Sequence, residues 1–365
     1  MPHSRSARFV NRPGSLPPAL LCRLLSLSAA LTLLGGPVLS ARAQETPAPS
    51  WCVSVWYPSS EHPGGYDSLL THLDIIDEVN PFWYAANADG TLLRHAGAED
   101  AEKLSAWRAA GLRILPTIAN ASPLAISDPQ TRAQHIEHIV ALVTGLDYDG
   151  IDIDYEEFPL STRDDFSLFV ETLAARLHAE GRLLSIAVHA KTEDFPAWEG
   201  AAAQDWARLS AAVDIFRIMT YDYHSRVSRD PGPIGPPDWA ADVLAYAATV
   251  TDLAKVRLGL HFYGYRWQRG GVSPVTWESV QRAVTAYGLT VQRDPDSQEA
   301  WVTIAQRGLP KQTIYVADAV ALDFKLGRLL AQYPTLGGVA IWGLGGEDPA
   351  NWDILRRYER GPCLR

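Results

Sequence analysis

The chain has 365 residues, of which 47% are hydrophobic and 20% are charged. This composition supports a sizeable buried core and excludes a globally disordered protein. Its formal net charge of -10 argues against nucleic acid as a partner, because binding to phosphates needs a basic surface.

The first 43 residues have the pattern of an export signal. Four arginines precede an apolar stretch over residues 24–34, and Ala41-Arg42-Ala43 offers a cleavage site of the small-x-small type. The apolar run is too short to span a bilayer, so we expect cleavage after Ala43 and no stable membrane span in the product. The segment removed contains five arginines and no acid, so the net charge becomes about -15. The expected location is secreted or in the cell envelope or periplasm.

Strand-like apolar runs alternate with helical patterns after a short polar linker over residues 44–50. Strands are expected at residues 51–57, 78–85, 112–118, 149–156, 183–188, 213–221, 256–262 and 338–342. Apolar residues at helical spacing predict helices that include 134–146, 164–177 and 242–254, the second of them capped by Ser161 or Thr162.

Eight strands alternating with helices predict a (β/α)8 barrel over residues 51–365. A doubly wound open sheet is the alternative, but no glycine-rich turn follows the first strand to support a nucleotide site. Residues 266–313 form too long a segment for a plain βα loop. They predict a small α+β insertion between strand 7 and helix 7 of the barrel.

Two cysteines remain once the export signal is removed. Cys52 and Cys363 lie near opposite ends of the predicted domain, which favours a disulfide that ties the ends together in an oxidising compartment. Two unpaired thiols are the alternative.

The most informative segment is the acidic run from Asp149 to Glu156, with sequence DGIDIDYE. A strand alternates its side chains between two faces, so Asp152, Asp154 and Glu156 share one face. Three neighbouring carboxyls repel one another, and burying them unpaired is costly. At a strand end they indicate a proton-transfer device in which charged neighbours keep one carboxyl protonated. A solvated acidic edge strand or a cation site is the alternative.

Polar and aromatic groups also end two other predicted strands. Tyr221 and Asp222 end the sixth strand, and Trp342 ends the eighth. Because barrel enzymes build their active sites at the C-terminal ends of the strands, these residues and Glu156 are expected on one rim.

These motifs resemble those of glycoside hydrolase family 18, the chitinase-like enzymes. The acidic run resembles the DGxDxDxE signature of the family, Met219 to Asp222 its M-x-Y-D motif, and Phe262 to Gly264 its F-Y-G motif. Trp342 matches the tryptophan that floors the sugar site. The resemblance is closest to the branch of spore-cortex-lytic and germination enzymes, on segments 81–84, 190–192, 221–224 and 348–352.

The resemblance implies a substrate-assisted retaining mechanism, an exception to the two-carboxylate scheme. Glu156 would protonate the glycosidic oxygen, and the N-acetyl carbonyl of the substrate would attack the anomeric carbon. Asp154 would hold the acetamido N–H, Tyr221 would bind the acetamido oxygen, and Asp152 would share a proton with Asp154. Asp222 would contribute to substrate binding. No cofactor or metal is implied.

The implied partner is a polysaccharide that contains N-acetylglucosamine, with peptidoglycan preferred and chitin or chito-oligosaccharides as the alternative. We expect a monomer. A non-catalytic lectin of the same family is less favoured, because such lectins typically lose the acid equivalent to Glu156. Two departures from typical chitinases, the absence of S-x-G-G in strand three and Gly264-Tyr265-Arg266 after strand seven, also argue for a separate branch.

Several further residues are assigned more loosely. Met219 is expected to line the pocket floor or to pack in the barrel, and Tyr263, Tyr57 and Tyr84 are candidate sugar contacts. His224 and His261 are expected to be hydrogen-bonded loop or core residues, since no partner spacing makes them metal ligands.

Overall fold

The computed structural model describes residues 51–58, 64–308, 310–359, 361 and 363. The predicted export signal and linker lie outside these residues. Parallel strands close into a barrel, since β1 pairs with both β2 and β15 and every neighbouring pair between them is parallel. The barrel strands are β1 (Cys52–Tyr57), β2 (Glu78–Ala86), β4 (Arg113–Ile114) with β5 (Thr117–Ala119), β6 (Gly150–Asp154), β7 (Leu183–His189), β8 (Ile215–Met219), β9 (Val256–His261) and β15 (Gly338–Trp342).

These strands confirm the predicted (β/α)8 barrel, with differences at strand ends. The third strand is split into β4 and β5 around Pro116, which has no N–H to give to a neighbouring strand. A short β3 (Leu92–Arg94) pairs antiparallel with the end of β2. Strands β6 and β8 end before Glu156 and Tyr221, so both residues lie in the loops that directly follow their strands.

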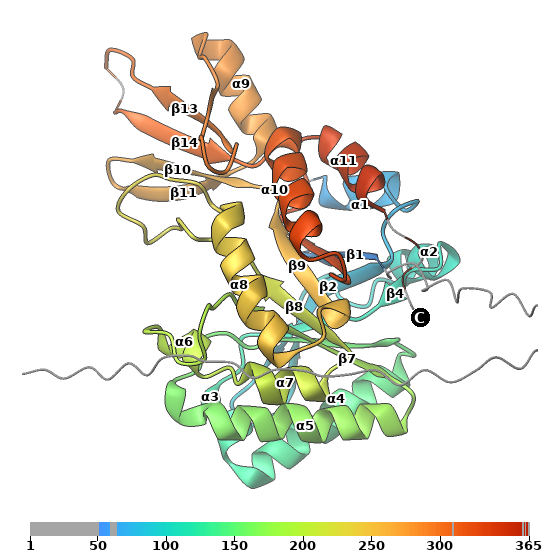
Figure 1. The fold of residues 1–365 in the computed structure, drawn as a ribbon. Helices are drawn as coiled ribbons and strands as arrows, with labels where there is room; N and C mark the ends of the chain where they lie inside the picture. Colours follow the sequence, from blue (N-terminus) through green and yellow to red (C-terminus); the bar gives the residue numbers. More distant parts are fainter. Residues whose placement is uncertain (1–50, 59–63, 309, 360, 362, 364–365) are drawn as a thin grey trace, which may run out of the picture. The chain divides into compact units, whose positions relative to one another are not determined.

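Helices cover the outside of the barrel (Figure 1). The helices beside the barrel strands are α1 (Gly65–Thr71), α2 (Ala101–Ala109), α4 (Pro129–Gly145), α5 (Arg163–Ala179), α7 (Trp206–Ala212), α8 (Pro237–Val250), α10 (Ala319–Gln332) and α11 (Ala350–Tyr358). Shorter turns are α3 (Pro123–Ser127), α6 (Glu199–Ala202) and the 3-10 helices Leu160–Thr162 and Leu253–Lys255.

The predicted helices exist, but two of them begin five residues earlier than predicted. Both α4 and α8 start at a proline, a residue suited to the first helical position because its missing N–H has no partner there. Asp128 caps α4 by accepting the N–H of Thr131. Thr162 does occupy the cap position of α5, yet its hydroxyl donates to the carbonyl of Pro159 instead of capping the helix.

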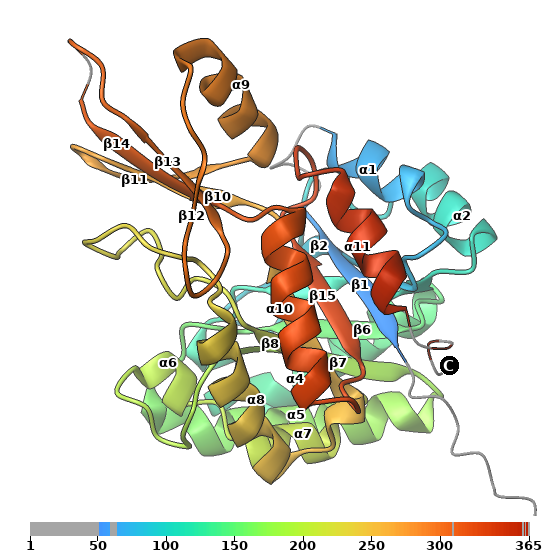
Figure 2. The same ribbon diagram turned by 45° about the horizontal axis from the view of Figure 1, so that its top comes forward.

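The insertion between β9 and α10 is larger in strand content than predicted (Figure 2). It is a five-stranded antiparallel sheet of order β11-β10-β14-β13-β12 with one helix and an apolar core of its own. Its elements are β10 (Gly264–Gln268), β11 (Gly271–Val275), α9 (Trp277–Tyr287), β12 (Gln292–Arg293), β13 (Ala300–Ile304) and β14 (Gln312–Val316).

Cys52 and Cys363 form the predicted disulfide, which joins the start of β1 to the segment after α11 across 311 residues of sequence. Within the described residues, no helix combines the length and the apolar character needed to cross a bilayer.

Candidate active site

A cleft of about 1050 Å³ lies at the C-terminal ends of the barrel strands. Residues from seven barrel strands or the loops after them line it, together with residues of the insertion. Among the lining residues are Trp56, Phe82, Asn120, Asp154, Glu156, Met219, Tyr221, Asp222, Arg226, Tyr263, Tyr265 and Trp342. Its size fits a segment of a polymer, since small-molecule sites span about 300–1,000 Å³.

The three predicted carboxyls run from the barrel core out to the cleft. Asp152 is fully buried, Asp154 is 6% exposed, and the side chain of Glu156 is 41% exposed. Alternation places Tyr155 on the opposite face, where its hydroxyl hydrogen-bonds Nε2 of His135 at 2.7 Å in the helix layer. The three acids therefore share one face, as predicted.

Asp152 lies behind the cleft and is saturated with hydrogen-bond donors. It accepts from Arg217 at 2.7 Å and from Ser185, Thr117 and the indole N–H of Trp56 at 2.6, 3.0 and 2.9 Å. These four donors, one of them a guanidinium, hold the carboxyl of Asp152 in place behind the cleft. The structure thus differs from the predicted proton sharing, because all four contacts on Asp152 are with groups other than Asp154.

Asp154 has the opposite environment. Its Oδ1 is buried and has no hydrogen-bond partner among the described residues. Burial, followed by the nearby charges of Glu156 and Asp152, raises the pKa of Asp154 well above its usual value. Asp154 therefore resists ionisation at the base of the cleft, and one of its oxygens is left to bind a ligand.

Glu156 is tuned to neutral pH. Burial, and then the charges of Glu157 and Asp222, raises the pKa of Glu156 to about 7. His189 lies beside it, with Nδ1 3.6 Å from the Glu156 carboxyl, but burial lowers the pKa of His189 to about 4 and leaves that ring neutral. Glu156 can consequently give a proton and take one back at the same pH.

Tyr221 and Asp222 face the acids from the loop after β8. Burial, and then the carboxyls of Asp154 and Glu156, raises the pKa of Tyr221, so its phenol stays a proton donor. Asp222 has a positive φ of 62° and accepts hydrogen bonds from the hydroxyls of Tyr263 at 2.5 Å and Tyr265 at 3.0 Å.

An aromatic floor completes the cleft at the end of β15. Trp342 is partly exposed and contacts Trp56 edge-on, at 6.4 Å between ring centroids, and Phe82 at 5.0 Å. Met219 and Tyr221 pack on the same cluster. Aromatic faces of this kind stack on the apolar faces of sugar rings.

Most of the predicted site residues meet in this cleft, and Asp152 supports it from behind. Two of the loosely assigned candidates do not line it. Tyr57 packs outward against Trp107, and Tyr84 hydrogen-bonds Tyr148 in the helix layer. Strand alternation explains the outcome for the first strand, because Trp56 points into the barrel and its neighbour Tyr57 must point away.

Sequence reasoning missed several residues of the site, which are Trp56, Phe82, Arg217, Arg226 and Tyr265. Arg217 did carry a signal, since it interrupts the apolar sixth strand with a full charge. Within the described chain, the one grouping with metal-ligand spacing is Cys52, Glu78 and Cys363. Its two sulfurs are joined in the disulfide, so it offers no ligand set.

The family model described as Glycosyl hydrolases family 18 matches residues 76–347. The chain belongs to this family. The predicted family is confirmed, and the matched residues contain the acidic run, the loop after β8 and Trp342.

Three proteins illustrate what the chain is similar to. The putative sporulation-specific glycosylase YdhD of Bacillus subtilis (strain 168) is 28% identical over 64% of this chain and 56% of that protein. A cortical fragment-lytic enzyme of the same strain is 25% identical over 63% of this chain and 54% of that protein. The chain thus spans a little over half the length of these curated relatives. The crystal structure of a chitinase from Chromobacterium violaceum ATCC 12472 matches with a TM-score of 0.78 and 25% identity, over 84% of this chain and 98% of that one. Family and relatives together bear out the prediction of a glycoside hydrolase.

Proposed function

We propose that the chain is an exported glycoside hydrolase that cleaves β-1,4 linkages after N-acetylglucosamine by a substrate-assisted retaining mechanism. The observation that supports this most strongly is the contrast between two neighbouring carboxyls. Burial raises the pKa of Asp154 well above its usual value, so that it resists ionisation, whereas Glu156 has a pKa of about 7. A neutral acid is a poor nucleophile, so the pair does not fit the two-carboxylate scheme, and a nucleophile carried by the substrate does.

In the proposed reaction, Glu156 gives its proton to the glycosidic oxygen as the bond to the anomeric carbon breaks. The acetamido carbonyl oxygen of the sugar attacks that carbon from the other face and forms a cyclic oxazolinium ion. Asp154 accepts the acetamido N–H through its unpartnered Oδ1, and Tyr221 donates to the acetamido oxygen. Water, deprotonated by Glu156, then opens the ring at the anomeric carbon with overall retention.

Glu156→Gln tests the assignment of the acid. The variant should lose turnover by at least about 10³-fold and still bind chito-oligosaccharides, because Gln keeps the shape but has no acidic proton. Glu180→Gln removes a matched exposed charge at the end of α5 and should leave turnover unchanged. Proton NMR of the first product should show the β-anomer. Unchanged hydrolysis by Glu156→Gln, or an inverted product, would refute the mechanism.

Peptidoglycan is the substrate we favour, and one cleft residue supports it besides the names of the relatives. Arg226 lines the cleft, is exposed, and forms no ion pair with another described residue. Chitin is a neutral polymer, whereas the N-acetylmuramic acid of peptidoglycan carries a lactyl group that is a carboxylate or joins an acidic peptide. A cation at the rim of an otherwise acidic cleft is suited to that group.

Side-by-side digestion of purified peptidoglycan and chitin oligomers, read by product masses, tests the choice of substrate. Arg226→Gln should lower kcat/KM on peptidoglycan fragments by about 10-fold and leave chito-oligosaccharides unaffected. Arg229→Gln, an exposed residue of the same loop outside the cleft lining, is the matched control. Preference for chitin, or an equal loss on both substrates, would favour the chitinase alternative.

Export remains part of the proposal. The disulfide between Cys52 and Cys363 is of the kind found in oxidising compartments outside the cytosol. We propose that residues 1–43 are removed, that 44–50 are a linker, and that the product is a monomer in the envelope or medium. Intact mass of the secreted protein should correspond to a start at Gln44; a mass that includes residues 1–43 would contradict cleavage.

A further inference from the structure

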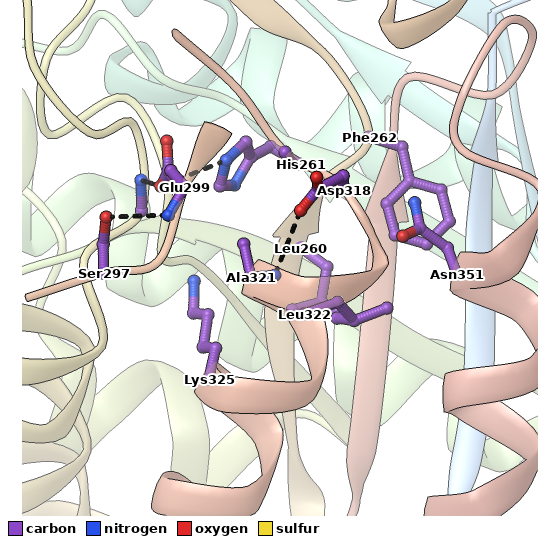
Figure 3. A pocket seen from close by; sticks show the side chains of 12 residues that line it. Leu260, His261, Phe262, Ser297, Glu299, Asp318, Ala321, Leu322, Lys325 and Asn351 are labelled. Atoms are coloured by element: carbon purple, nitrogen blue, oxygen red, sulfur yellow. Dashed lines mark hydrogen bonds and ion pairs between the residues drawn. The ribbon is translucent and has the colours of Figure 1, made fainter. Parts of the chain in front are cut away.

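Three charged or titratable side chains form a buried cluster beside the loop that carries Tyr221 and Asp222. We call Glu299, Lys325 and His261 the Glu299 cluster; they come from the insertion just before β13, from α10 and from the end of β9. Glu299, Lys325 and His261 are only 2%, 4% and 6% exposed. Figure 3 shows the Glu299 carboxyl facing the imidazole, with the Lys325 amine pointing to the same space.

Glu299 binds the loop through its backbone. One carboxyl oxygen accepts the N–H of Ile234 and the other accepts the N–H of Gly235, both at 2.8 Å. Nε2 of His261 lies 3.5 Å from the carboxyl. Burial opposes ionisation, but the charge of His261 and these hydrogen bonds outweigh it and lower the pKa of Glu299. The insertion therefore presents a buried carboxylate whose two oxygens both hold the loop.

Lys325 binds the same loop at its other end. Its Nζ donates to the carbonyl of Thr220 at 3.0 Å, directly before Tyr221. The N–H of Tyr223 in turn donates to the carbonyl of Ile234 at 2.9 Å, the residue whose own N–H binds Glu299. The chain is thus fastened on both sides of Tyr221 and Asp222.

The segment between these fastenings has an unfavourable backbone conformation. Asp222 has a φ of 62°, in the left-handed region that non-glycine residues seldom adopt. Such conformations persist where the surroundings over-determine them, and they gather at functional sites. The hydroxyls of Tyr263 and Tyr265 hold the side chain of Asp222, and the Glu299 cluster holds the backbone around it.

The space beside the Glu299 cluster is too small for a ligand site. The cavity measures about 20 Å³, which is room for roughly one water molecule. The cluster also packs tightly on the loop, because a Cβ added to Gly235 would lie 2.7 Å from Cε1 of His261 and 2.9 Å from Nζ of Lys325. This geometry therefore fixes the insertion to the loop.

We infer that the Glu299 cluster is a set of positioning residues that holds Tyr221 and Asp222 in the conformation needed at the acetamido group of the substrate. The inference rests on the role proposed above for Tyr221. It assigns the insertion a part in the chemistry of the cleft through Glu299, in addition to forming one side of the cleft. None of the three residues lines the cleft, so each acts through the loop.

Glu299→Gln and Lys325→Met test this inference. In Glu299→Gln, the side-chain N–H₂ group cannot accept a hydrogen bond, so one of the two backbone N–H groups loses its acceptor. In Lys325→Met, the hydrogen bond to the Thr220 carbonyl is lost. Both variants should therefore release the loop. We expect kcat to fall about 10- to 100-fold and KM to stay within about 3-fold of the wild-type value, because the substitutions misorient groups at the reacting centre. Lys325→Arg, which keeps a donor, should recover part of the lost kcat.

A control separates positioning from simple loss of stability. Asp214 accepts the N–H of Leu184 at 2.8 Å, near the start of β8 and far along the strand from the cleft. Asp214→Asn should lower the melting temperature with kcat unchanged at 25 °C. Amide hydrogen exchange over residues 220–235 should accelerate in the two cluster variants and stay at the wild-type rate in the control.

The outcomes distinguish the inference from the proposed function. A wild-type protein that does not cleave polymers of N-acetylglucosamine, or a Glu156→Gln variant with full activity, would refute the proposed function itself. An active wild type with an inactive Glu156→Gln, but with wild-type kcat in both cluster variants, would overturn only the positioning role. Should the variants not fold, exchange in the wild type decides: fast exchange at Ile234 and Gly235 would equally overturn it.

Discussion

Replacing Glu157 with Gln tests whether Glu156 is the acid whose protonation limits turnover. Glu157 is exposed, directly follows Glu156, and is not among the residues that line the cleft. After burial, its charge is the largest influence that raises the pKa of Glu156 to about 7. The substitution removes that charge and keeps the size of the side chain.

The expected magnitude follows from the populations of the acid. With a pKa of about 7, roughly half of Glu156 is protonated at neutral pH, against about 0.3% at the ordinary value of 4.5. Two carboxylates roughly 6 Å apart in a water-like dielectric repel by about 0.7 kcal/mol, or about half a pH unit. Because the protonated form is the active acid, kcat/KM falls as pH rises through the pKa. Glu157→Gln lowers that pKa, so the fall should begin about half a pH unit earlier and cost about 3-fold at pH 8.

Initial rates on a fluorogenic chitobioside across roughly pH 5 to 9 measure this descending limb. About 1 M salt shortens the screening length to about 3 Å and should bring the limbs of wild type and variant together. Glu180→Gln, which removes an exposed charge beyond α5, should leave the limb in place. An unmoved limb in Glu157→Gln at low salt would show that the titrating acid is not Glu156, and the mechanism would need another proton donor.

Three other predictions address the core, the chain ends and the cleft. Arg217→Met removes the guanidinium that pairs with buried Asp152, while Glu78 keeps Arg113 and Arg257, and it should cost about 3–5 kcal/mol of unfolding free energy in urea titrations. A loss below about 1 kcal/mol would contradict the pairing of Arg217 with Asp152. Cys52→Ser combined with Cys363→Ser should cost about 2–4 kcal/mol by thermal unfolding, and an unchanged melting temperature would argue that the bridge does not form in solution. Tyr221→Phe should lower kcat about 10²- to 10³-fold with little change in KM, whereas Trp342→Ala should chiefly raise KM; the reverse pattern would exchange their roles.

The barrel was predictable because parallel strands covered on both faces are continuous apolar runs. Apolar residues predominate in most of the eight strands, although β6 (Gly150–Asp154) alternates isoleucine with aspartate. The apolar spacing over 164–177 corresponds to a helix at 163–179. The insertion was only partly predictable. Its strand β11 contains a proline and buries only its last residue, and β12 has two residues, so neither carries a strand pattern. Both are strands because the neighbouring strands pair with them, which is a tertiary effect.

The acidic run and the rim residues were predictable because their order along one strand, and their place at strand ends, determine where they point. The buried contacts that hold the site from behind were not. Arg217 meets Asp152 across 65 residues of sequence and Glu78 across 139, and Lys325 meets Thr220 across 105. No local pattern encodes such pairings, which arise only when the barrel closes and the insertion packs onto it.

Three similar carboxyls on one strand face have three different environments. The Arg217 guanidinium lies at the inner end of the row, where it donates to both Asp152 and Glu78. Burial, followed by the charges of Glu156 and Asp152, penalises ionisation of Asp154, the next position outward, and raises its pKa well above the usual value. Glu156 is the third in the row and the most exposed, so solvent relieves part of the same penalty and its pKa stops at about 7. The gradient from core to cleft therefore gives the outermost carboxyl the exchangeable proton. An arginine placed beside Asp154 instead would ionise it and leave the cleft with a competing nucleophile.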